Sequence, residues 1–201
     1  MIQAIKQQLT HSPIERAPLP EDHSKLSAVF LLLRNTPEPE ILFVQRAQTL
    51  RHHPGEIGFP GGKVDALDRH LLDTAHREVE EEIGIAANRI EAIAQLRKQR
   101  TRYGLWVTPF VGIIEPEVDF APDQSEIDHV FSVSVNHFFN VDHRRYKHVT
   151  YRHIPLKFPG YTYQNHHIWG LTHRVLVDFL NEGLNAKLTP RPSSIRWPWQ
   201  K

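Results

Sequence analysis

Residues 77–85, with the sequence REVEEEIGI, constrain this chain more than any other stretch. They place glutamates at positions 78, 81 and 82, and spacings of three and four residues bring side chains onto one face of a helix. Three like charges on one face repel each other, so a cation among them would stabilise the cluster. Hard divalent cations prefer oxygen ligands. The spacing therefore predicts a helix that presents Glu78, Glu81 and Glu82 to a divalent metal ion.

The same helix is expected to have an adjacent apolar face. Each helical residue turns the chain by about 100°, which places Glu80 nearly opposite the other three glutamates, as a solvated charge. The apolar stripe consists of Leu72, Ala75, Val79 and Ile83. We expect this stripe to pack against a core. We expect Gly84 to end the helix, because glycine tolerates the left-handed conformation.

A glycine-rich segment precedes the acidic helix. A run of glutamates taken alone is typical of an exposed helix surface. Here, however, residues 59–65 (FPGGKVD) place two glycines directly after an expected strand at residues 56–59. Glycines permit tight turning and the close approach of a ligand to the backbone. We therefore expect a glycine-rich turn that cradles a metal-bound phosphate together with the helix.

Residues 62–85 resemble the Nudix box of the Nudix hydrolases. In that motif a glycine and a glutamate precede Arg-Glu, an aliphatic residue, a Glu-Glu pair, a glycine and a second aliphatic residue. The second half matches at every fixed position, through Arg77, Glu78, Val79, Glu81, Glu82, Gly84 and Ile85. The first half departs from the motif, because Asp68 replaces the first glutamate and one additional residue separates it from Arg77.

The residues upstream resemble the extended signature of coenzyme A-type Nudix pyrophosphatases. The matching positions are Leu42, Arg46, Leu50, Arg51, His53, Gly55, Phe59, Pro60, Gly61, Gly62 and Ala75. Val44 and Ala47 stand where that signature has a threonine and a serine. The box and its extension together cover about a fifth of the chain, and combined motifs of this length are specific.

The resemblance implies an α/β (α+β) fold, a Nudix-type α/β/α sandwich with a mixed β-sheet. It also implies Mg²⁺, or Mn²⁺ in its place, as the cofactor, since both ions take oxygen ligands. The implied metal ligands are Glu78, Glu81, Glu82 and the main-chain carbonyl of Gly62. Arg77 is expected to pair with an acid of the box and not with the substrate.

The remaining site residues are also implied by the resemblance. Glu81 is expected either to activate the attacking water or to serve only as a ligand. Glu126, in a loop before a strand, is the second catalytic candidate, and a solvated loop charge is its competing interpretation. Arg46, Arg51 and His53 are expected to bind substrate phosphates, for which arginine offers bidentate geometry.

The implied reaction is metal-dependent hydrolysis of a nucleoside-diphosphate-linked compound. We expect cleavage of the phosphoanhydride of coenzyme A or its derivatives, giving adenosine 3′,5′-bisphosphate and (acyl) 4′-phosphopantetheine. The alternative is an ADP-ribose or dinucleotide pyrophosphatase. A second alternative is a non-catalytic Nudix-fold nucleotide sensor or RNA-binding protein, because residues 97–102 (RKQRTR) are basic and adjoin Tyr103. The intact acidic half of the box disfavours this second alternative.

Composition limits the partners of the chain. Its 201 residues carry a net charge of +1, which gives no overall attraction to nucleic acid or anionic lipid. There is no cysteine, so disulfides and thiolate metal sites are excluded. No apolar run has the length that spans a bilayer. We expect a cytoplasmic enzyme with a small-molecule nucleotide as partner and no membrane contact. Nucleic acid is disfavoured, and a homodimer is left open.

The length suits one compact domain with extensions. We expect an N-terminal extension at residues 1–25, a Nudix hydrolase domain at residues 26–184 and a C-terminal tail at residues 185–201. Strands are expected at residues 28–33, 41–44, 90–96, 105–114 and 130–135. A late hairpin is expected to turn at Pro159-Gly160.

Overall fold

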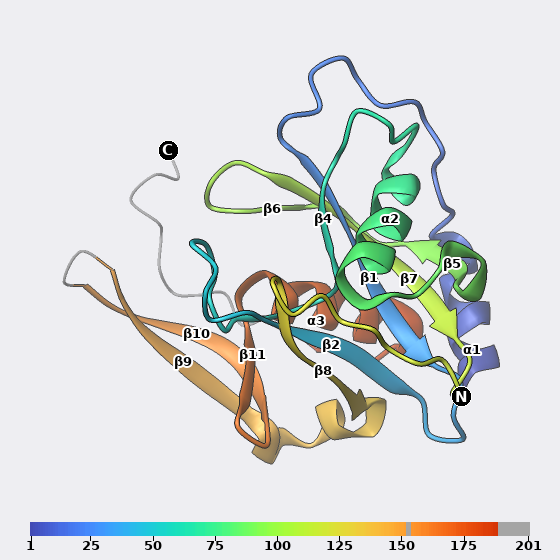
Figure 1. Ribbon diagram of the computed structural model, residues 1–201. Coiled ribbons are helices and arrows are strands. Elements are labelled where there is room, and N and C mark those ends of the chain that lie inside the picture. Colours follow the sequence, from blue (N-terminus) through green and yellow to red (C-terminus); the bar gives the residue numbers. More distant parts are fainter. Residues whose placement is uncertain (152–153, 189–201) are drawn as a thin grey trace.

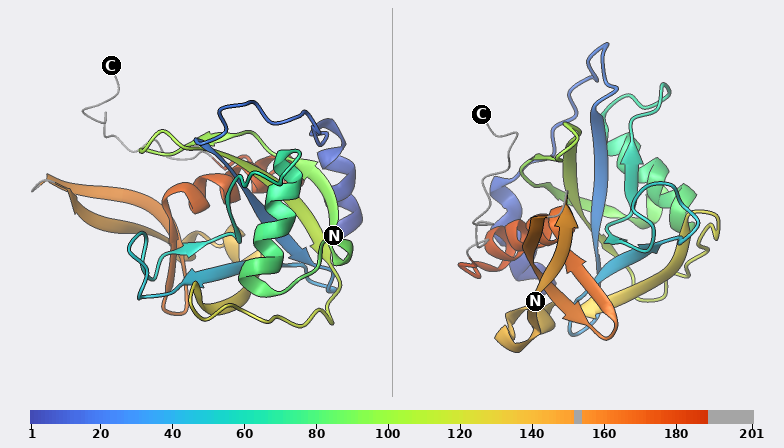
Figure 2. Two further views of the ribbon diagram at one scale, coloured as in Figure 1. Left: turned by 45° about the horizontal axis from the view of Figure 1, so that its top comes forward. Right: turned by 90° about the vertical axis from the view of Figure 1, so that its left-hand side faces the viewer.

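The computed structural model describes residues 1–151 and 154–188, and it shows a central β-sheet between helices (Figure 1). Helix α2 covers one face of the sheet, and α1 and α3 pack together on the other (Figure 2). The helices are α1 (Ile2–Gln8), α2 (Leu71–Ile83) and α3 (Gly170–Leu184). The strands of the central sheet are β1 (Leu26–Arg34), β2 (Glu40–Arg46), β3 (Ile57–Gly58), β4 (Gly61–Lys63), β5 (Glu91–Gln95), β6 (Gln99–Arg100), β7 (Trp106–Ile114) and β8 (Ile127–Ser134). The predicted α/β/α sandwich is confirmed.

Strand β1 is the centre of the sheet. Along its whole length it pairs in parallel with β7. All other pairings of the sheet are antiparallel, so the sheet is mixed, as predicted. On its second edge, β1 pairs with β4 through residues 27–29 and with β2 through residues 33–34. Strands β2 and β4 therefore diverge from the same edge of β1, and this fork positions the site described below.

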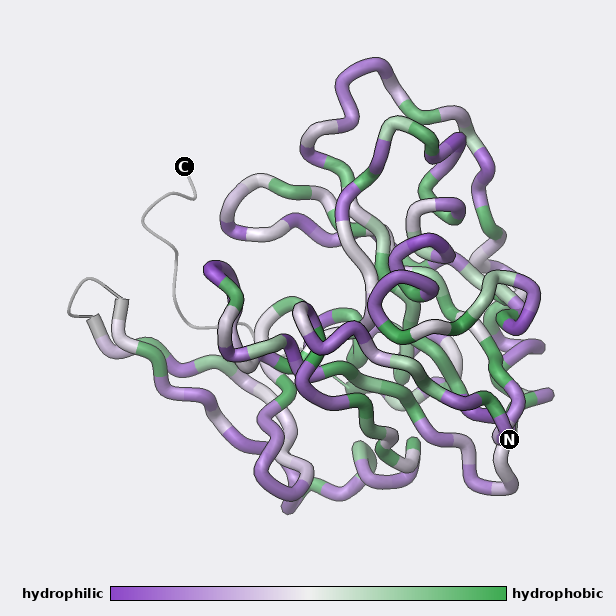
Figure 3. The backbone as a smooth tube through the Cα atoms, viewed as in Figure 1, coloured by the Kyte–Doolittle hydropathy of each residue, from purple (hydrophilic) through white to green (hydrophobic). Residues whose placement is uncertain are grey.

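Strand β1 is apolar on both faces because both faces are covered. On one side, Phe30 and Leu32 pack with Phe110 and with the predicted stripe of α2, Leu72, Ala75, Val79 and Ile83. On the other side, Leu31 and Leu33 pack with residues from α1 and α3, among them Ile5, Leu176 and Phe179. Figure 3 shows the hydrophobic residues on these central elements and the hydrophilic ones mainly on loops and hairpins.

Helix α2 has a defined start and end. The ring of His70 accepts a hydrogen bond from the backbone N–H of Asp73 at 3.2 Å, which caps the first turn. Gly84 ends the helix with φ = 74°, in the left-handed region, as predicted. Among the helices of the described ranges, none combines the length and the apolar character needed to span a bilayer.

The prediction of a glycine-rich turn is wrong. Gly61–Lys63 form strand β4, in which Gly62 lies opposite Ala28 of β1. The turn comes later, at residues 66–67. Gly61 has φ = 146°, and a Cβ at this position would collide with the backbone of Ala28 and Val29. The glycine therefore allows two strands to approach closely and does not reverse the chain.

A second sheet has the order β11-β10-β9 and consists of β9 (Arg144–Tyr151), β10 (Ile154–Tyr163) and β11 (His166–Trp169). The predicted turn at Pro159-Gly160 is wrong, because β10 continues through both residues. The chain instead reverses between Tyr163 and His166. A Cβ at Gly160 would collide with the carbonyl of Ile168, so this glycine also serves close strand packing.

Both ends of the described chain lie against the core. Ile5 in α1 is fully buried and packs in the same cluster as Phe179 of α3. At the other end, the side-chain amide of Asn181 bonds both the N–H and the carbonyl of Leu188, at 2.6 and 2.7 Å. Most of the expected C-terminal tail, residues 189–201, lies outside the described residues.

Candidate active site

Glu82 lies in the fork between β2 and β4. Its side chain is 4% exposed, and Oε2 accepts a hydrogen bond from the backbone N–H of Gly61 at 2.9 Å. Oε1 is 3.7 Å from Nη1 of Arg46, the last residue of β2. Helix α2 thus inserts a carboxylate where the sheet divides, and each branch of the fork supplies one partner.

The surroundings of Glu82 disfavour its charge. Burial raises the pKa of Glu82 to about 8, although the hydrogen bond from Gly61 favours the anion. The nearby carboxylates of Glu78 and Glu126 raise this pKa further, whereas Arg46 lowers it. An additional positive charge close to Glu82 would stabilise its anion. The position therefore favours a bound cation.

Glu78 faces the second glycine of β4. A Cβ at Gly62 would collide with the carboxylate of Glu78, so the absent side chain provides the room that this carboxylate occupies. Burial raises the pKa of Glu78, and the adjacent Arg77 opposes this shift. The carbonyl of Gly62 accepts a hydrogen bond from Oγ of Ser27 at 2.5 Å.

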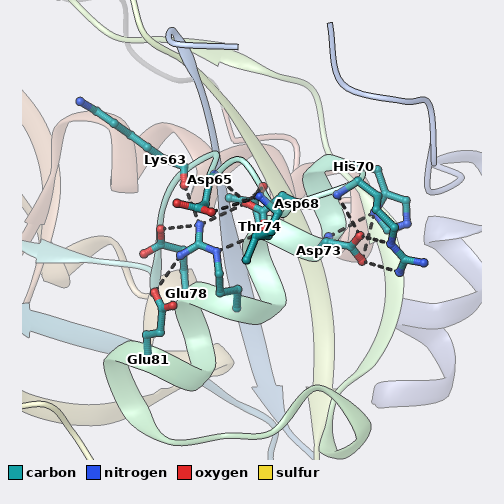
Figure 4. A network of polar contacts seen from close by, with 11 residues as sticks. Lys63, Asp65, Asp68, His70, Asp73, Thr74, Glu78 and Glu81 are labelled. Atoms are coloured by element: carbon teal, nitrogen blue, oxygen red, sulfur yellow. Dashed lines mark hydrogen bonds and ion pairs between the residues drawn. The ribbon is translucent and has the colours of Figure 1, made fainter. Parts of the chain in front are cut away.

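Arg77 connects the acids of the helix to the preceding loop, within the polar network drawn in Figure 4. Its Nη1 donates to Oε2 of Glu81 at 2.7 Å, and Nη2 is 3.0 Å from Oε1 of Glu78. Nη2 also donates to the carbonyl of Lys63 at 2.8 Å, and Nε donates to Oδ1 of Asp68 at 3.1 Å. The expected pairing of Arg77 with an acid of the box is therefore present, and the same side chain holds two predicted metal ligands.

Asp68 is the buried end of this network. Its side chain is 4% exposed, and Oδ2 accepts hydrogen bonds from Oγ1 of Thr74 at 2.8 Å and from the N–H of Asp65 at 2.9 Å. Although burial alone would raise the pKa of Asp68, these bonds and those from Arg77 lower it. The turn between Asp65 and Asp68 brings the short acid to Arg77. We therefore infer that the additional residue between Asp68 and Arg77 compensates for the shorter side chain of the aspartate.

Glu126 lies beside the carboxylates of the helix. The loop that leads to it is attached to the end of α2, where the N–H of Asp123 donates to the carbonyl of Glu82 at 3.0 Å. The Glu126 side chain is exposed. The negative charge of Glu126 raises the pKa of both Glu78 and Glu82, after the larger effect of their burial. The loop that carries Glu126 is thus anchored to the end of the acidic helix.

The three residues expected to bind substrate occupy different positions. Arg46 reaches the carboxylate of Glu82, as described above. Arg51 is exposed in the loop that follows β2. His53, in the same loop, has φ = 57°, and its Nδ1 is 2.8 Å from Oε2 of Glu56. Arg46 therefore lies in the carboxylate cluster, and the other two lie on the loop between β2 and β3.

The residues of the cluster fit a divalent cation by their chemistry. Carboxylate oxygens are the ligands that Mg²⁺ and Mn²⁺ prefer. The carboxylate of Glu78 occupies the space that a side chain at position 62 would fill. Within residues 1–151 and 154–188, no group of three or more His, Asp or Glu side chains is arranged to hold an ion as it stands. The carboxylates of Glu78 and Glu81 are instead paired with Arg77. A cation would compete with Arg77 for these carboxylates.

A cleft of about 300 Å³ opens on the other side of β2. Consecutive side chains of a strand point to opposite faces, so Gln45 lines this cleft while Arg46 faces Glu82. Its other lining residues include Lys147, His166, His167 and Trp169. Sequence analysis did not identify this cleft, because only the tertiary fold brings β9 and β11 beside β3.

The fold and the carboxylate cluster define the class of protein. A family model described as the NUDIX domain matches residues 24–159, which is more than half of the chain. The chain therefore belongs to the Nudix family. It is an enzyme, a Nudix hydrolase that acts as a pyrophosphatase on nucleoside-diphosphate compounds.

Relatives and solved structures agree with this class. The protein named "Uncharacterized Nudix hydrolase NudL" from Photorhabdus laumondii is 33% identical over 155 residues, which cover 77% of this chain and 83% of the relative. The NudL protein of Yersinia pestis is 32% identical over 155 residues, covering 76% of this chain and 77% of its own. A MutT/nudix family protein from Enterococcus faecalis superimposes with a TM-score of 0.50 at 16% identity, over 92% of this chain and 74% of that one. At this identity the structural likeness concerns the fold alone.

Proposed function

We propose that this enzyme hydrolyses the phosphoanhydride of coenzyme A or its acyl derivatives, releasing adenosine 3′,5′-bisphosphate and the corresponding 4′-phosphopantetheine. The position of the upstream signature carries the proposal. Its Arg46 is 3.7 Å from Glu82. The N–H of Arg46 also donates to the carbonyl of Glu56 at 3.1 Å, so the loop with Arg51 and His53 begins and ends beside the carboxylates. The contact between Arg46 of the signature and Glu82 of the box supports a single site.

Mg²⁺, or Mn²⁺ in its place, is the proposed cofactor. Glu78, Glu81 and Glu82 would hold it, with the main-chain carbonyl of Gly62 as a further candidate ligand. When bound, the ion supplies charge neutralisation at the diphosphate and lowers the pKa of a water molecule. The guanidinium of Arg46 faces the same cluster and can bind a phosphate oxygen that approaches Glu82.

Glu81 and Glu126 are the proposed catalytic residues. The Glu81 side chain is 60% exposed, against 16% for Glu78 and 4% for Glu82. Of the three glutamates proposed to bind the metal, Glu81 is therefore the most accessible to a water molecule whose proton must be removed. Glu126 is exposed beside the same cluster and assists.

Arg51 and His53 are proposed to bind phosphate groups at the rim of the site. Both are exposed on the loop between β2 and β3. Arginine offers planar paired donors to phosphate oxygens, and an imidazole N–H of His53 can donate a hydrogen bond to a phosphate oxygen. We assign Arg51 and His53 to phosphate groups of the substrate that extend beyond the carboxylate cluster.

A substrate panel tests the proposed function. Coenzyme A, acetyl-coenzyme A, ADP-ribose and a diadenosine polyphosphate are each assayed with Mg²⁺ and with Mn²⁺, and the products are identified by mass. We expect the highest kcat/KM for coenzyme A or its acyl form, with adenosine 3′,5′-bisphosphate as a product. An equal or higher kcat/KM for ADP-ribose or the dinucleotide would assign the enzyme to the alternative substrate class.

The non-catalytic alternative is disfavoured, because the chain belongs to a hydrolase family and retains the three glutamates proposed to bind the metal. We place the enzyme in the cytoplasm, since a sequence without cysteine suits a reducing compartment. Fractionation of cells that express a tagged enzyme tests this location, and recovery outside the cytoplasmic fraction would contradict it.

A further inference from the structure

A basic hairpin, residues 97–106, extends beyond the sheet beside the site (Figure 1). It consists of β6, a turn and the start of β7. The N–H of Thr101 donates to the carbonyl of Leu105 at 2.8 Å, and the N–H of Gly104 donates to the carbonyl of Thr101 at 3.1 Å. Gly104 has φ = 84°, as this tight turn requires. The hairpin is therefore a defined structure that can present its side chains in fixed positions.

One face of the basic hairpin collects its cations. Gln99 points toward α3, where its side-chain amide bonds the carboxylate of Asp178. Because strand residues alternate between faces, Lys98 and Arg100 point the other way. There Nζ of Lys98 and Cζ of Arg100 lie 5.3 and 5.6 Å from the ring centre of Trp106. The hairpin thus offers an aromatic surface flanked by two cations.

This face of the hairpin is also the face of the sheet that carries the active site. Trp106 precedes Phe110 by four residues in β7, so both point to the same side, and Phe110 packs against α2. Trp106 lies opposite Leu26 of β1, and Lys63 of β4 lies opposite Ser27. Two strand spacings, about 10 Å, therefore separate β7 from β4. A nucleoside can span this distance.

The tip of the basic hairpin reaches the loop with the proposed phosphate-binding residues. The rings of Tyr103 and His53 are 6.4 Å apart in an edge-to-face arrangement. The guanidinium of Arg102 lies over the Tyr103 ring at 4.6 Å. The hairpin and the loop project to the same side of the sheet in Figures 1 and 2. The tip of the hairpin therefore contacts the loop that carries Arg51 and His53.

Three cations of the basic hairpin lack counter-charges. Within the described part of the chain, no carboxylate lies within ion-pair distance of Lys98, Arg100 or Arg102. Residues 97–106 contain no acid. Arg97 differs, because its Nη2 is 3.3 Å from Oδ1 of Asp178. Unpaired cations beside aromatic rings favour an anionic ligand with a planar base.

We propose that the basic hairpin binds a phosphomonoester on the nucleoside of the substrate, which in coenzyme A is the 3′-phosphate. Arg100 and Arg102 supply paired donors to its oxygens, Lys98 adds charge, and Trp106 offers a surface for the base. The enzyme consequently prefers 3′-phosphorylated substrates. This inference rests on the proposed function, since it names what binds the part of the substrate beyond the diphosphate.

The test compares coenzyme A with 3′-dephospho-coenzyme A, which differ only in this phosphate. For the wild type we expect kcat/KM to favour coenzyme A by about tenfold or more, the effect of one charge-assisted hydrogen bond. The double variant Arg100→Gln/Arg102→Gln should lose this preference while its kcat/KM for the dephospho form stays within about twofold of the wild type. Arg89→Gln, at an exposed arginine after α2, is the matched control and should keep the preference.

A binding measurement gives a readout that does not depend on turnover. By calorimetry, the wild type should bind adenosine 3′,5′-bisphosphate about tenfold more tightly than AMP. The double variant should bind both equally, and equal binding by the wild type would contradict the inference.

The outcomes separate the two proposals. A wild type that cleaves neither form of coenzyme A overturns the proposed function, and this inference falls with it. A wild type that cleaves both forms, with a double variant that keeps the preference or loses both activities equally, overturns the inference alone. RNA binding that the double variant loses, with substrate preference unchanged, would assign the basic hairpin to nucleic acid and also overturn the inference.

Discussion

Nε of Arg77 donates a hydrogen bond at 3.1 Å to Oδ1 of Asp68, nine residues earlier in the chain. This contact ties the loop after β4 to the middle of the acidic helix. The remaining nitrogens of Arg77 then hold Glu81 and Glu78. The orientation of two proposed metal ligands therefore depends on an aspartate that lies outside the carboxylate cluster.

Substitutions of Asp68 test this dependence. Asp68→Asn should lower the free energy of unfolding by about 2–4 kcal/mol, because it leaves the partly buried Arg77 without its most deeply buried anionic partner. Asp68→Glu should lower it by about 1–3 kcal/mol, because the longer side chain overfills a site matched to a short acid. Urea denaturation measures both. The exposed Asp119→Asn is the control, and unchanged stability of Asp68→Glu would show that the additional residue is not matched to the aspartate.

Gly62→Ala should reduce kcat/KM by about 100-fold with little change in Tm. The added Cβ meets the carboxylate of Glu78, which is the movable end of a flexible side chain, so the fold is retained while the carboxylate is displaced. A displacement of about 1 Å is enough for a loss of this size. Gly58→Ala is the matched control, because a Cβ there has nothing within 4 Å. Full activity of Gly62→Ala would show that the room at this glycine is not needed.

Separate glutamine substitutions test the catalytic residues. Glu81→Gln should lower kcat by about 100-fold or more, the range for loss of a general base, and Glu126→Gln should cause a smaller loss. Tm should stay close to the wild type in both, since both side chains are exposed. Glu80→Gln, on the opposite side of the same helix, should be fully active. A full rate for Glu81→Gln would remove Glu81 from the mechanism.

Glu82→Gln should stabilise the metal-free protein by about 1–3 kcal/mol, because a neutral amide replaces a carboxylate buried near two others. The amide oxygen can still accept the hydrogen bond from Gly61. Mg²⁺ at about 100 times its Kd should stabilise the wild type by about 2.7 kcal/mol but leave the variant unchanged. Denaturation with EDTA and with Mg²⁺ measures both effects, and an equal gain in both proteins would show that Glu82 does not hold the ion.

Acid should destabilise the fold through His173 of α3. This side chain is 6% exposed, and burial lowers its pKa from 6.5 to about 4. The unfolded chain thus binds the proton more readily, so stability is fully present above about pH 6.5 and falls by about 3 kcal/mol as the pH drops toward 4. Urea denaturation across this range should show a flatter acid slope for His173→Gln. The exposed His11→Gln should keep the wild-type slope, and identical slopes for all three proteins would contradict the prediction.

Sequence patterns within one segment correctly predicted the helix and the strand that depend on interactions within that segment. The stripe from Leu72 to Ile83 and the stop at Gly84 follow from helical spacing and from the freedom of glycine, and α2 shows both. The apolar run in β1 predicted a buried strand correctly. The glycine pair of β4 and Pro159-Gly160 were predicted as turns, because their local preference is for turns. Both segments lie in strands instead. There the glycines, which have no Cβ, allow a neighbouring backbone or side chain to approach closely.

The sequence by itself determined a helix with glutamates at 78, 81 and 82, because the spacing of side chains on a helix depends only on the helix. The tertiary structure alone decided that Glu82 enters the fork, that Glu81 stays exposed and that Arg46 arrives at 3.7 Å. It also decided that the basic hairpin shares the face of the sheet with these acids. Burial and the pKa of a carboxylate depend on which strands surround it, and that is set by pairings between segments far apart in the chain.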